Sequence, residues 1–447
     1  MDQPAALKPG SLSFVEVLAT SVALIGPSMT PLLIAPGMFA LAGNSTWLAY
    51  VFGAAMLVFV ALNINQFARR SSKAGSMYGY VADNLGRTAG ALNGWALLWA
   101  YGFTAAAVVG AMALFGNLLL GDVGLHAPPI VIAIVVAAIA WQAAYRGVQI
   151  SAIVMLVLEV ISVAIICIVV GVVLFHQGPH LDVNQTTLRG GFPGGIGLAL
   201  AFAMFSFVGF ESATAFGAEA KNPLAAIPRA VIGSVIFAGT FFIVVTYAEI
   251  VGMAHAPQPL DKQTFPLGTL VDLFNIGFLR VPLTIGALCS AFSVCLACIT
   301  TAGRIAYAMA MEGSLPAAFA RIEPKHDTPN VAVTVITAIT LAVAVVCLAS
   351  GIAPIDVFEN CGVLSSFGFI LIYALISIAA FLYVKRAGES RWSDMAISFL
   401  ALACLIVPAV TLFYPVPAPP QRYFAYYFLA FLVVGWGWFT LRRKAIA

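Results

Sequence analysis

Long, uninterrupted runs of apolar residues, separated by short polar segments, dominate the sequence. Two of these runs read VMLVLEVISVAIICIVVGVVLF and IVIAIVVAAIAW, without the alternation of polar and apolar residues that is typical of membrane β-strands. A helix that crosses the hydrocarbon core of a bilayer needs about 20 apolar residues. The pattern therefore predicts twelve membrane-spanning helices, at residues 14–40, 46–67, 88–120, 128–145, 148–175, 194–218, 227–253, 280–311, 330–351, 355–384, 392–413 and 422–442.

The composition strengthens this prediction. Of the 447 residues, 62% are hydrophobic and 9% are charged, and the mean hydropathy is +1.01, whereas a soluble domain carries about 25% charged residues. We expect an all-α integral membrane protein with one transmembrane domain over residues 1–447. The formal net charge of +3 comes without a basic or acidic tail, so we expect no nucleic acid partner.

The distribution of Lys and Arg predicts the orientation, because cytoplasmic loops are enriched in both. If both termini are cytoplasmic, 17 of the 21 Lys and Arg residues fall on the inner side, and the outer four are Arg189, Lys262, Arg280 and Arg422. A missed or additional span would scramble this alternation. We therefore expect a multi-pass protein of the cell (plasma) membrane that is surrounded by the lipid bilayer, as a monomer or a homodimer.

The residues of common enzyme and metal sites are not gathered within the spans. The five histidines fall in predicted loops, and Cys295 and Cys298 form a CxxC without a second pair. Neither HExxH nor GxSxG occurs. We expect no enzyme, no metal and no cofactor; a channel remains as an alternative from a different class, although the sequence has no TVGYG-like pore loop.

Helix-breaking residues interrupt the first and the sixth predicted spans. In SVALIGPSMTPLLIAPGMFA, Gly26, Pro27 and Pro31 surround Ser28, Met29 and Thr30, and proline removes an amide donor from a helix. In FSFVGFESATAF, glycine precedes a carboxylate at the middle of a span. Discontinuous helices at matching positions of two halves indicate a transporter substrate site, with simple kinks as the alternative. The substrate-binding residues predicted here are Gly26, Ser28, Met29, Thr30, Phe205, Ser206, Phe207 and Gly209.

Ionisable side chains inside a membrane are costly and indicate function. Glu159 lies within the fifth predicted span and Glu211 within the sixth. We interpret Glu16, Glu249 and Glu359, near predicted span ends, as interfacial carboxylates. Glu211 is thus either a proton sensor or a cap for the free amides of the broken helix.

Three segments resemble the amino acid–polyamine–organocation (APC) superfamily. FSFVGFESATAFGAEAKNPLAAIPRAVIGS resembles its sixth span and the following loop, SSKAGSMYGYVADNLGRTAGALNGWALLW its loop between spans 2 and 3, and TTAGRIAYAMAMEGSLPAAFARIEPKHDTPNVAV the end of span 8. The resemblance implies a LeuT-type fold of two inverted five-helix repeats, about 14–175 and 194–384, plus two spans at about 392–442. It also implies a secondary active transporter, or permease, that moves amino acids or related amines by alternating access.

The resemblance also assigns roles to single residues. It makes Phe205 a gate and Glu211 a proton sensor, and it places the neutral Ser162 where several proton-coupled members carry a lysine. Glu159 lies one turn from Ser162 and offers a protonatable group instead. Ser162, Ser290 and Ser293 form the alternative of a sodium site. We expect coupling to a proton gradient, and sodium symport and amino acid or amine exchange stay open as alternatives.

Overall fold

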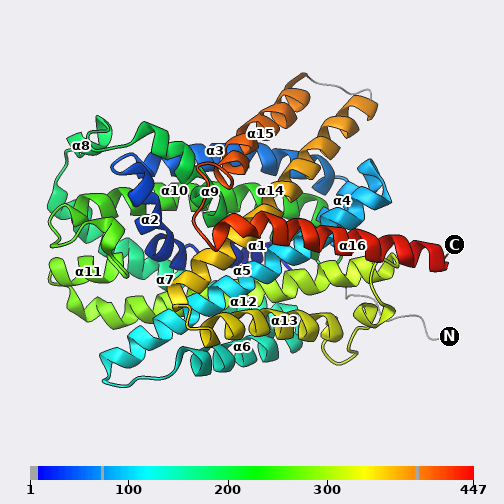
Figure 1. The fold of residues 1–447 in the computed structure, drawn as a ribbon, viewed down its shortest axis with the longest axis horizontal. Coiled ribbons are helices and arrows are strands. Elements are labelled where there is room, and N and C mark those ends of the chain that lie inside the picture. Colours follow the sequence, from blue (N-terminus) through cyan, green and yellow to red (C-terminus); the bar gives the residue numbers. More distant parts are fainter. Residues whose placement is uncertain (1–8, 72–74, 388–391, 447) are drawn as a thin grey trace.

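A computed structural model describes residues 9–71, 75–387 and 392–446, and helices account for most of them (Figure 1). Each predicted span corresponds to helical structure. Ten of the predicted spans are single helices: α3 (Thr46–Ala68), α5 (Arg87–Asp122), α6 (Pro129–Tyr145), α7 (Val148–Gln177), α10 (Pro223–Met253), α12 (Arg280–Met311), α13 (Asn330–Ala349), α14 (Pro354–Ala387), α15 (Trp392–Thr411) and α16 (Phe424–Ile446).

The first and sixth spans are divided. The first consists of α1 (Phe14–Ile25) and α2 (Met29–Ala42), and the sixth of α9 (Pro193–Ser206) and the short 3₁₀ helix η1 (Ser212–Phe216). Among the described residues, ten helices are long and apolar enough to cross a membrane, with α1 and α2 counted together, and α6 and α9 are apolar but shorter. The all-α membrane class is confirmed, whereas the twelve crossings and the inverted repeats of a LeuT-type fold stay predictions.

The connecting segments contain short helices that the apolar pattern does not predict. They are α4 (Ser76–Leu85), α8 (Val183–Thr186), α11 (Pro266–Leu273), η2 (Leu260–Lys262), η3 (Gly277–Leu279), η4 (Ala317–Ala320) and η5 (Gln421–Tyr423). Their runs of apolar residues are too short to be read as spans. Tertiary packing therefore determines these elements more than the hydropathy pattern does.

Helix α5 forms the centre of the bundle and packs against α12 and α14 (Figure 1). Small residues bring α5 and α14 together, since a Cβ added to Gly368 would lie 2.8 Å from the Cβ of Ala100. Close packing of small residues is the usual basis of helix association in membranes. The outward faces are apolar: Ile161 on α7, Phe399 on α15 and Val434 on α16 are all more than half exposed, as expected of side chains that face lipid.

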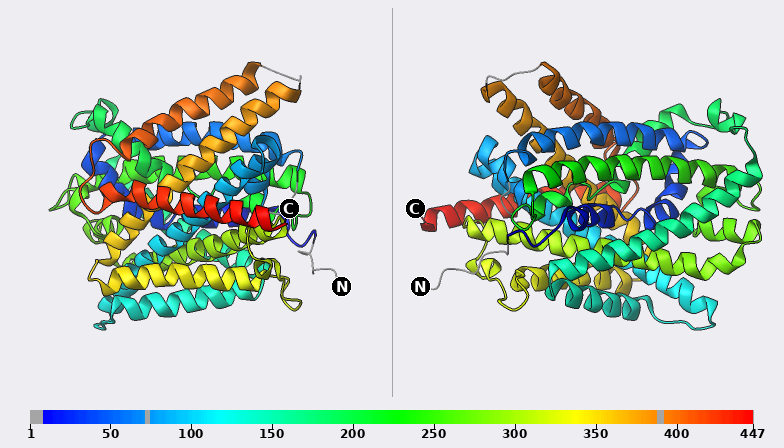
Figure 2. Two further views of the ribbon diagram at one scale, coloured as in Figure 1. Left: turned by 45° about the vertical axis from the view of Figure 1, so that its right-hand side comes forward. Right: turned by 180° about the vertical axis from the view of Figure 1, so that it is seen from behind.

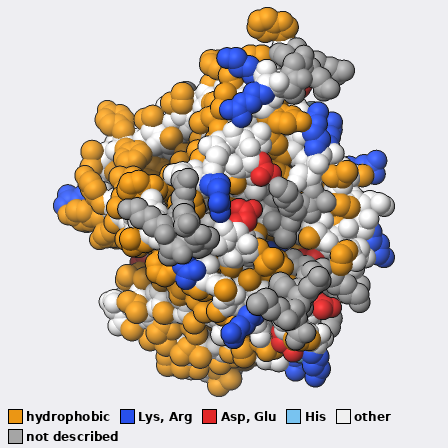
Figure 3. Space-filling model, turned by 90° about the vertical axis from the view of Figure 1, so that its right-hand side faces the viewer, with side chains coloured by type: hydrophobic (Ala, Val, Ile, Leu, Met, Phe, Trp, Pro, Cys, Tyr) orange, Lys and Arg blue, Asp and Glu red, His pale blue; other side chains and the backbone are white. Residues whose placement is uncertain are grey.

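The segment that leads into α1 and the end of α16 lie at the same end of the bundle, here called the terminal end (Figures 1 and 2). Lys and Arg side chains are scattered over this end face, between hydrophobic flanks (Figure 3). Lys8, Lys73 and Arg391, three of the predicted inner cations, lie outside the described residues. The first and last described segments of the chain thus share one side, and its assignment to the cytoplasm stays a prediction.

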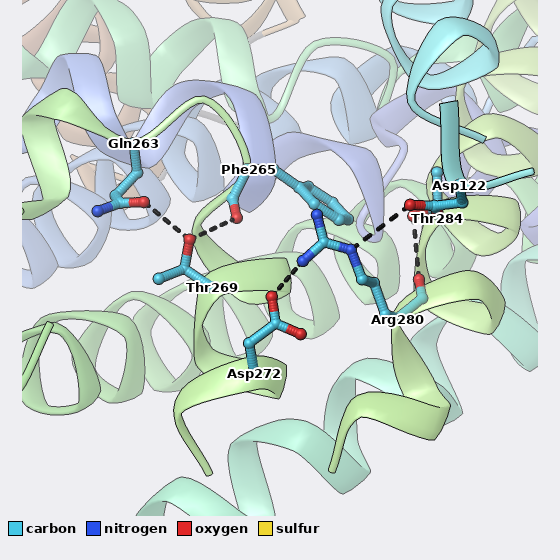
Figure 4. Close-up of polar contacts among 7 residues, drawn as sticks. All are labelled: Asp122, Gln263, Phe265, Thr269, Asp272, Arg280 and Thr284. Carbon is cyan, nitrogen blue, oxygen red and sulfur yellow. Dashed lines mark hydrogen bonds and ion pairs between the residues drawn. The ribbon is translucent and has the colours of Figure 1, made fainter. Parts of the chain in front are cut away.

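The segment between α10 and α12 forms ion pairs at the opposite end of the bundle. Arg280, at the start of α12, pairs with Asp272 of α11 and with Asp122 at the end of α5, where the Nε–Oδ1 distance is 3.7 Å (Figure 4). Thr269 donates a 2.8 Å hydrogen bond to the side chain of Gln263. Arg280, one of the four predicted outer cations, therefore fastens α11 to two spans.

A buried ion pair lies toward the terminal end of the bundle. Arg304 of α12 is 1% exposed and donates to Glu219, which follows η1, over 2.5 and 2.9 Å. Its guanidinium lies 4.5 Å from the centre of the Phe216 ring. The backbone of Leu12 bonds to Glu219 O and Lys221 N, over 3.0 and 2.8 Å. We call Glu219, Arg304 and Phe216 the terminal seal.

A second contact braces α4 at this end. The Tyr78 hydroxyl donates to Glu312 Oε2 over 2.9 Å and lies 3.2 Å from Ser314 Oγ. Burial raises the pKa of this hydroxyl well above its ordinary value, so it remains a donor at physiological pH. The tyrosine thus ties α4 to the end of α12.

Breaking the terminal seal on one side is expected to destabilise the protein. Arg304→Met leaves the Glu219 carboxylate buried without a partner, which typically costs about 3–5 kcal/mol. Adding Glu219→Leu to Arg304→Met removes the unpaired charge and is expected to recover much of the loss. Thermal unfolding of the purified proteins measures both effects, with exposed Arg321→Met as the control. A double variant as unstable as the sum of the two single variants would contradict this account.

Candidate functional site

The break in the first span begins at Gly26. This residue has φ +60° in the left-handed region, and a Cβ on it would lie 2.5 Å from Val294 of α12. The left-handed backbone favours glycine, and the contact leaves no room for a side chain. Pro27 and Ser28 follow before α2 starts at Met29. The predicted interruption is confirmed, and its position follows from glycine and proline chemistry.

The break in the sixth span occupies residues 207–211. Gly209 has φ +108°, and a Cβ on it would lie 2.2 Å from Leu24 of α1. Ser21 of α1 donates to Phe210 O over 2.9 Å and accepts from Ala213 N over 3.1 Å. The first half of span 1 therefore supplies polar partners to the backbone that the second break frees, as a membrane interior requires.

A small apolar cavity of about 20 Å³ lies between the two breaks. No charged side chain is among its described lining residues, which are Leu24, Ile25, Met29, Thr30, Ile34, Thr104, Val108, Phe205, Val208, Val294 and Phe358. The sequence predicts Met29, Thr30 and Phe205 among them. It misses the contributions of α5, α12 and α14, because Thr104, Val108, Val294 and Phe358 do not differ in type from other residues of these apolar helices.

Phe205 separates this cavity from a larger one of about 380 Å³. Phe205, Phe358 and Ile34 line both cavities, and the ring centres of the two phenylalanines are 5.9 Å apart. The larger cavity extends to Pro415 and Gln421 in the connection between α15 and α16. Phe205 thus has the position that a gate requires, and its gating role stays a prediction.

Glu159 of α7 reaches the first break. Its Oε1 accepts hydrogen bonds from Ser28 N (3.0 Å), Ser28 Oγ (2.9 Å) and Ser290 Oγ of α12 (3.0 Å). Oε2 has no hydrogen-bond partner among the described residues. The carboxyl is 1% exposed and joins three helices. The structure therefore brings together Ser28, Glu159 and Ser290, three residues that the sequence predicts for binding or coupling.

Glu211 closes the second break. Tyr101 of α5 donates to its Oε1 over 2.6 Å, and Tyr373 of α14 donates to its Oε2 over 2.9 Å. The amide of Gly209 also donates to Oε2, over 3.2 Å. The capping alternative for Glu211 thus has a geometric basis. Neither tyrosine is distinguishable in the sequence from other aromatic residues of the spans.

Other predicted residues lie away from the cavity. Ser206 Oγ is 3.2 Å from Tyr50 OH, and Phe207 packs against Tyr50 and Phe242 on the side of α3 and α10. The interpretation of Glu249 as interfacial is wrong: it is fully buried in α10, and neither carboxyl oxygen has a hydrogen-bond partner among the described residues.

The three serines of the sodium alternative do not share a partner in this structure. Ser162 donates to the carbonyls of Leu158 and Gly286 over 2.7 and 3.0 Å. Ser290 bonds to Glu159, and Ser293 Oγ has no partner in the described part of the chain. The hydroxyls therefore serve helix packing and Glu159 in the conformation seen here.

Comparison with known proteins settles the family. The family model described as amino acid permease matches residues 23–444. The chain belongs to the amino acid permease family. The predicted membership of the APC superfamily is thereby confirmed, and the protein is a multi-pass membrane permease rather than an enzyme.

Several curated relatives are similar over most of this permease. The branched-chain amino acid permease BcaP of Bacillus subtilis is 24% identical over 92% of this chain and 86% of its own length. BcaP of Lactococcus lactis is 28% identical over 67% of this chain and 69% of its own length. A probable GABA permease of Pseudomonas aeruginosa is 26% identical over 91% of this chain and 87% of its own length.

A side chain at Gly209 is expected to disrupt the site. Gly209→Ala places a methyl group 2.2 Å from Leu24 at a positive φ, so the second break must shift, with a cost of at least about 1 kcal/mol from the backbone alone. We expect a lower unfolding temperature and a loss of transport. Gly233→Ala on α10, where a Cβ meets nothing within 4 Å, is the matched control. Equal behaviour of the two variants would refute the requirement for glycine.

Proposed function

We propose that this permease carries neutral amino acids with apolar side chains across the cell membrane by proton-coupled alternating access. The observation that carries this proposal is the apolar cavity between the two helix breaks, which no charged residue lines among the described residues. An arginine, lysine or glutamate side chain buried there would lack a counter-charge, which is costly. Burial of an aliphatic side chain in the same apolar surroundings is favourable. The two relatives named as branched-chain amino acid permeases support this choice.

The polar groups of the two breaks would bind the carboxylate and the ammonium group, which all amino acid substrates share. The amino end of α2 presents N–H donors and a positive dipole end, which suit a carboxylate. Carbonyls freed where α9 ends suit an ammonium group. The apolar cavity next to Met29 and Val208 would then hold the side chain.

Alternating access requires one seal on each side of the site. Phe205 and Phe358 line both the small cavity and the larger one, and in this proposal the terminal seal, the buried Arg304–Glu219 pair with Phe216, would close the other side. A cavity of about 20 Å³ has room for roughly one water molecule. Substrate therefore enters only when Phe205 and Phe358 move apart and join the two cavities.

Proton coupling is favoured by the carboxyls at the breaks. Glu159 and Glu211 are each buried against one break, whereas Ser162, Ser290 and Ser293 share no hydrogen-bond partner within the described structure. A carboxyl at membrane depth can take up a proton without a cage of oxygen ligands. Exchange without a coupling ion is the second candidate.

The substrate class can be tested by counterflow in proteoliposomes. Liposomes loaded with unlabelled leucine are expected to accumulate external labelled leucine transiently, which a channel cannot do. Excess isoleucine or valine should compete, and lysine or glutamate should not. Val108→Phe fills the cavity and is expected to weaken leucine uptake at least tenfold, with lipid-facing Val157→Phe as the control. Counterflow of lysine in place of leucine would reject the proposed substrate class.

The coupling ion is tested with an imposed pH gradient. With choline replacing sodium on both sides, an acidic exterior is expected to drive leucine above its equilibrium level, and a protonophore should abolish the accumulation. Each proton moved down a gradient of one pH unit supplies about 1.4 kcal/mol, enough for tenfold accumulation. Accumulation that requires sodium and ignores the pH gradient would show that the coupling ion is sodium.

A further inference from the structure

Each helix break in this structure already binds a carboxylate of the protein itself. Glu159 Oε1 receives three donors at the first break: the amide and the hydroxyl of Ser28 and the hydroxyl of Ser290. The amide belongs to the residue that precedes α2, a helix of 14 residues. Converging N–H and O–H donors at a helix N-terminus constitute a carboxylate receptor.

The other donors of the first break are already used by the backbone. Met29 N and Thr30 N both donate to Gly26 O, over 3.1 and 3.0 Å, and Thr30 Oγ1 donates to Ile25 O. Met29 N also donates to Ser290 Oγ over 3.3 Å, which leaves the hydroxyl hydrogen of Ser290 for a carboxylate. Pro27 and Pro31 have no amide hydrogen. A substrate carboxylate that approaches span 1 therefore finds its donors at Ser28 and Ser290, and Glu159 holds them.

The two carboxyls differ in how they can be released. Glu211 belongs to its own break, and its two oxygens are held by Tyr101, Tyr373 and Gly209. Glu159 comes from a separate helix, α7, and only one of its oxygens is bonded within the described structure. Glu159 can thus withdraw without rearranging the chain around a break.

We propose that Glu159 occupies the receptor for the substrate carboxylate in the empty transporter, and that substrate displaces it. This inference rests on the proposed transport of amino acids. The displaced Glu159 would be a buried carboxylate without donors, so it takes up one proton from water as the substrate carboxylate binds Ser28 and Ser290. One anion replaces another at the receptor, no covalent bond changes, and each bound amino acid carries one proton with it.

The surroundings of Glu159 contain few other charges. The ionisable groups on the helices packed against α7 include Glu16, Glu249, Asp272, Arg280, Cys289 and Arg304. Arg304 pairs with Glu219, Arg280 pairs with Asp272, and Glu16 caps α1. Cys289 directly precedes Ser290, whose hydroxyl bonds to Glu159. Glu249 has no hydrogen-bond partner among the described residues, so of these carboxyls Glu159 is the one bonded to the donors of the first break.

The test is calorimetric titration of the purified permease with leucine in two buffers that differ in ionisation enthalpy. For the wild-type protein we expect uptake of about one proton per leucine, and a Kd that rises about tenfold per pH unit once Glu159 is ionised. Glu159→Gln, which cannot ionise, is expected to bind leucine without proton uptake and with a flat pH profile. Glu249→Gln, at a buried carboxyl without a hydrogen-bond partner among the described residues, is the matched control and should keep the wild-type proton uptake.

A second experiment uses the wild-type protein and an amine that lacks the substrate carboxylate. Leucine without its carboxylate, 3-methylbutylamine, does not compete with Glu159, so its displacement of labelled leucine should give an amine affinity that is independent of pH. Proton uptake retained in Glu159→Gln, or amine binding with the pH dependence of leucine, overturns the inference. Leucine binding without proton uptake in the wild-type protein overturns it as well and leaves the substrate proposal standing. Absence of leucine binding at every pH rejects both this inference and the proposed substrate class.

Discussion

A backbone that leaves the helical path inside a membrane must find partners for every polar group that it frees. The site of this permease depends on that constraint at two places. At the first break the protein supplies Glu159 and Ser290, and at the second it supplies Ser21, Glu211, Tyr101 and Tyr373. The positive φ of Gly26 and Gly209 makes these turns possible. The side-chain partners lower the free-energy cost of the polar groups that the turns leave unpaired at membrane depth.

The same partners connect the breaks to the rest of the bundle. Glu159 joins α7, α12 and the start of α2 through hydrogen bonds of about 3 Å, while Glu211 joins span 6 to α5 and α14. A change of charge at either carboxyl therefore alters bonds between helices that line the cavity. In the proposed cycle, coupling between proton and substrate would rest on direct contact, because Glu159 and the substrate carboxylate would use the same donors.

The hydropathy pattern located the spans closely because α3, α5 and α12 begin and end where apolar runs do. Gly26, Pro27 and Gly209 revealed the breaks because few residues have so strong a backbone preference. By contrast, Tyr101, Val108 and Phe358 lie on helices that are apolar on all faces, so no periodicity shows which side faces the cavity. The prediction for Glu249 is wrong because α10 packs against neighbouring helices along its length, and a span end in sequence need not be a surface in space.

The two seals differ in chemistry. In the proposed cycle, the free-energy cost of separating Phe205 and Phe358 is therefore lower than the cost of separating Arg304 and Glu219. Phe205 and Phe358 touch through apolar rings, so their separation breaks no hydrogen bond and exposes apolar surface that a substrate side chain can cover. Arg304 and Glu219 are a buried ion pair, so their separation leaves two charges that only water can satisfy. Opening at the terminal end therefore requires water to enter with the movement. In the proposed cycle, water that reaches Arg304 and Glu219 would link release of the substrate to release of the proton at this end.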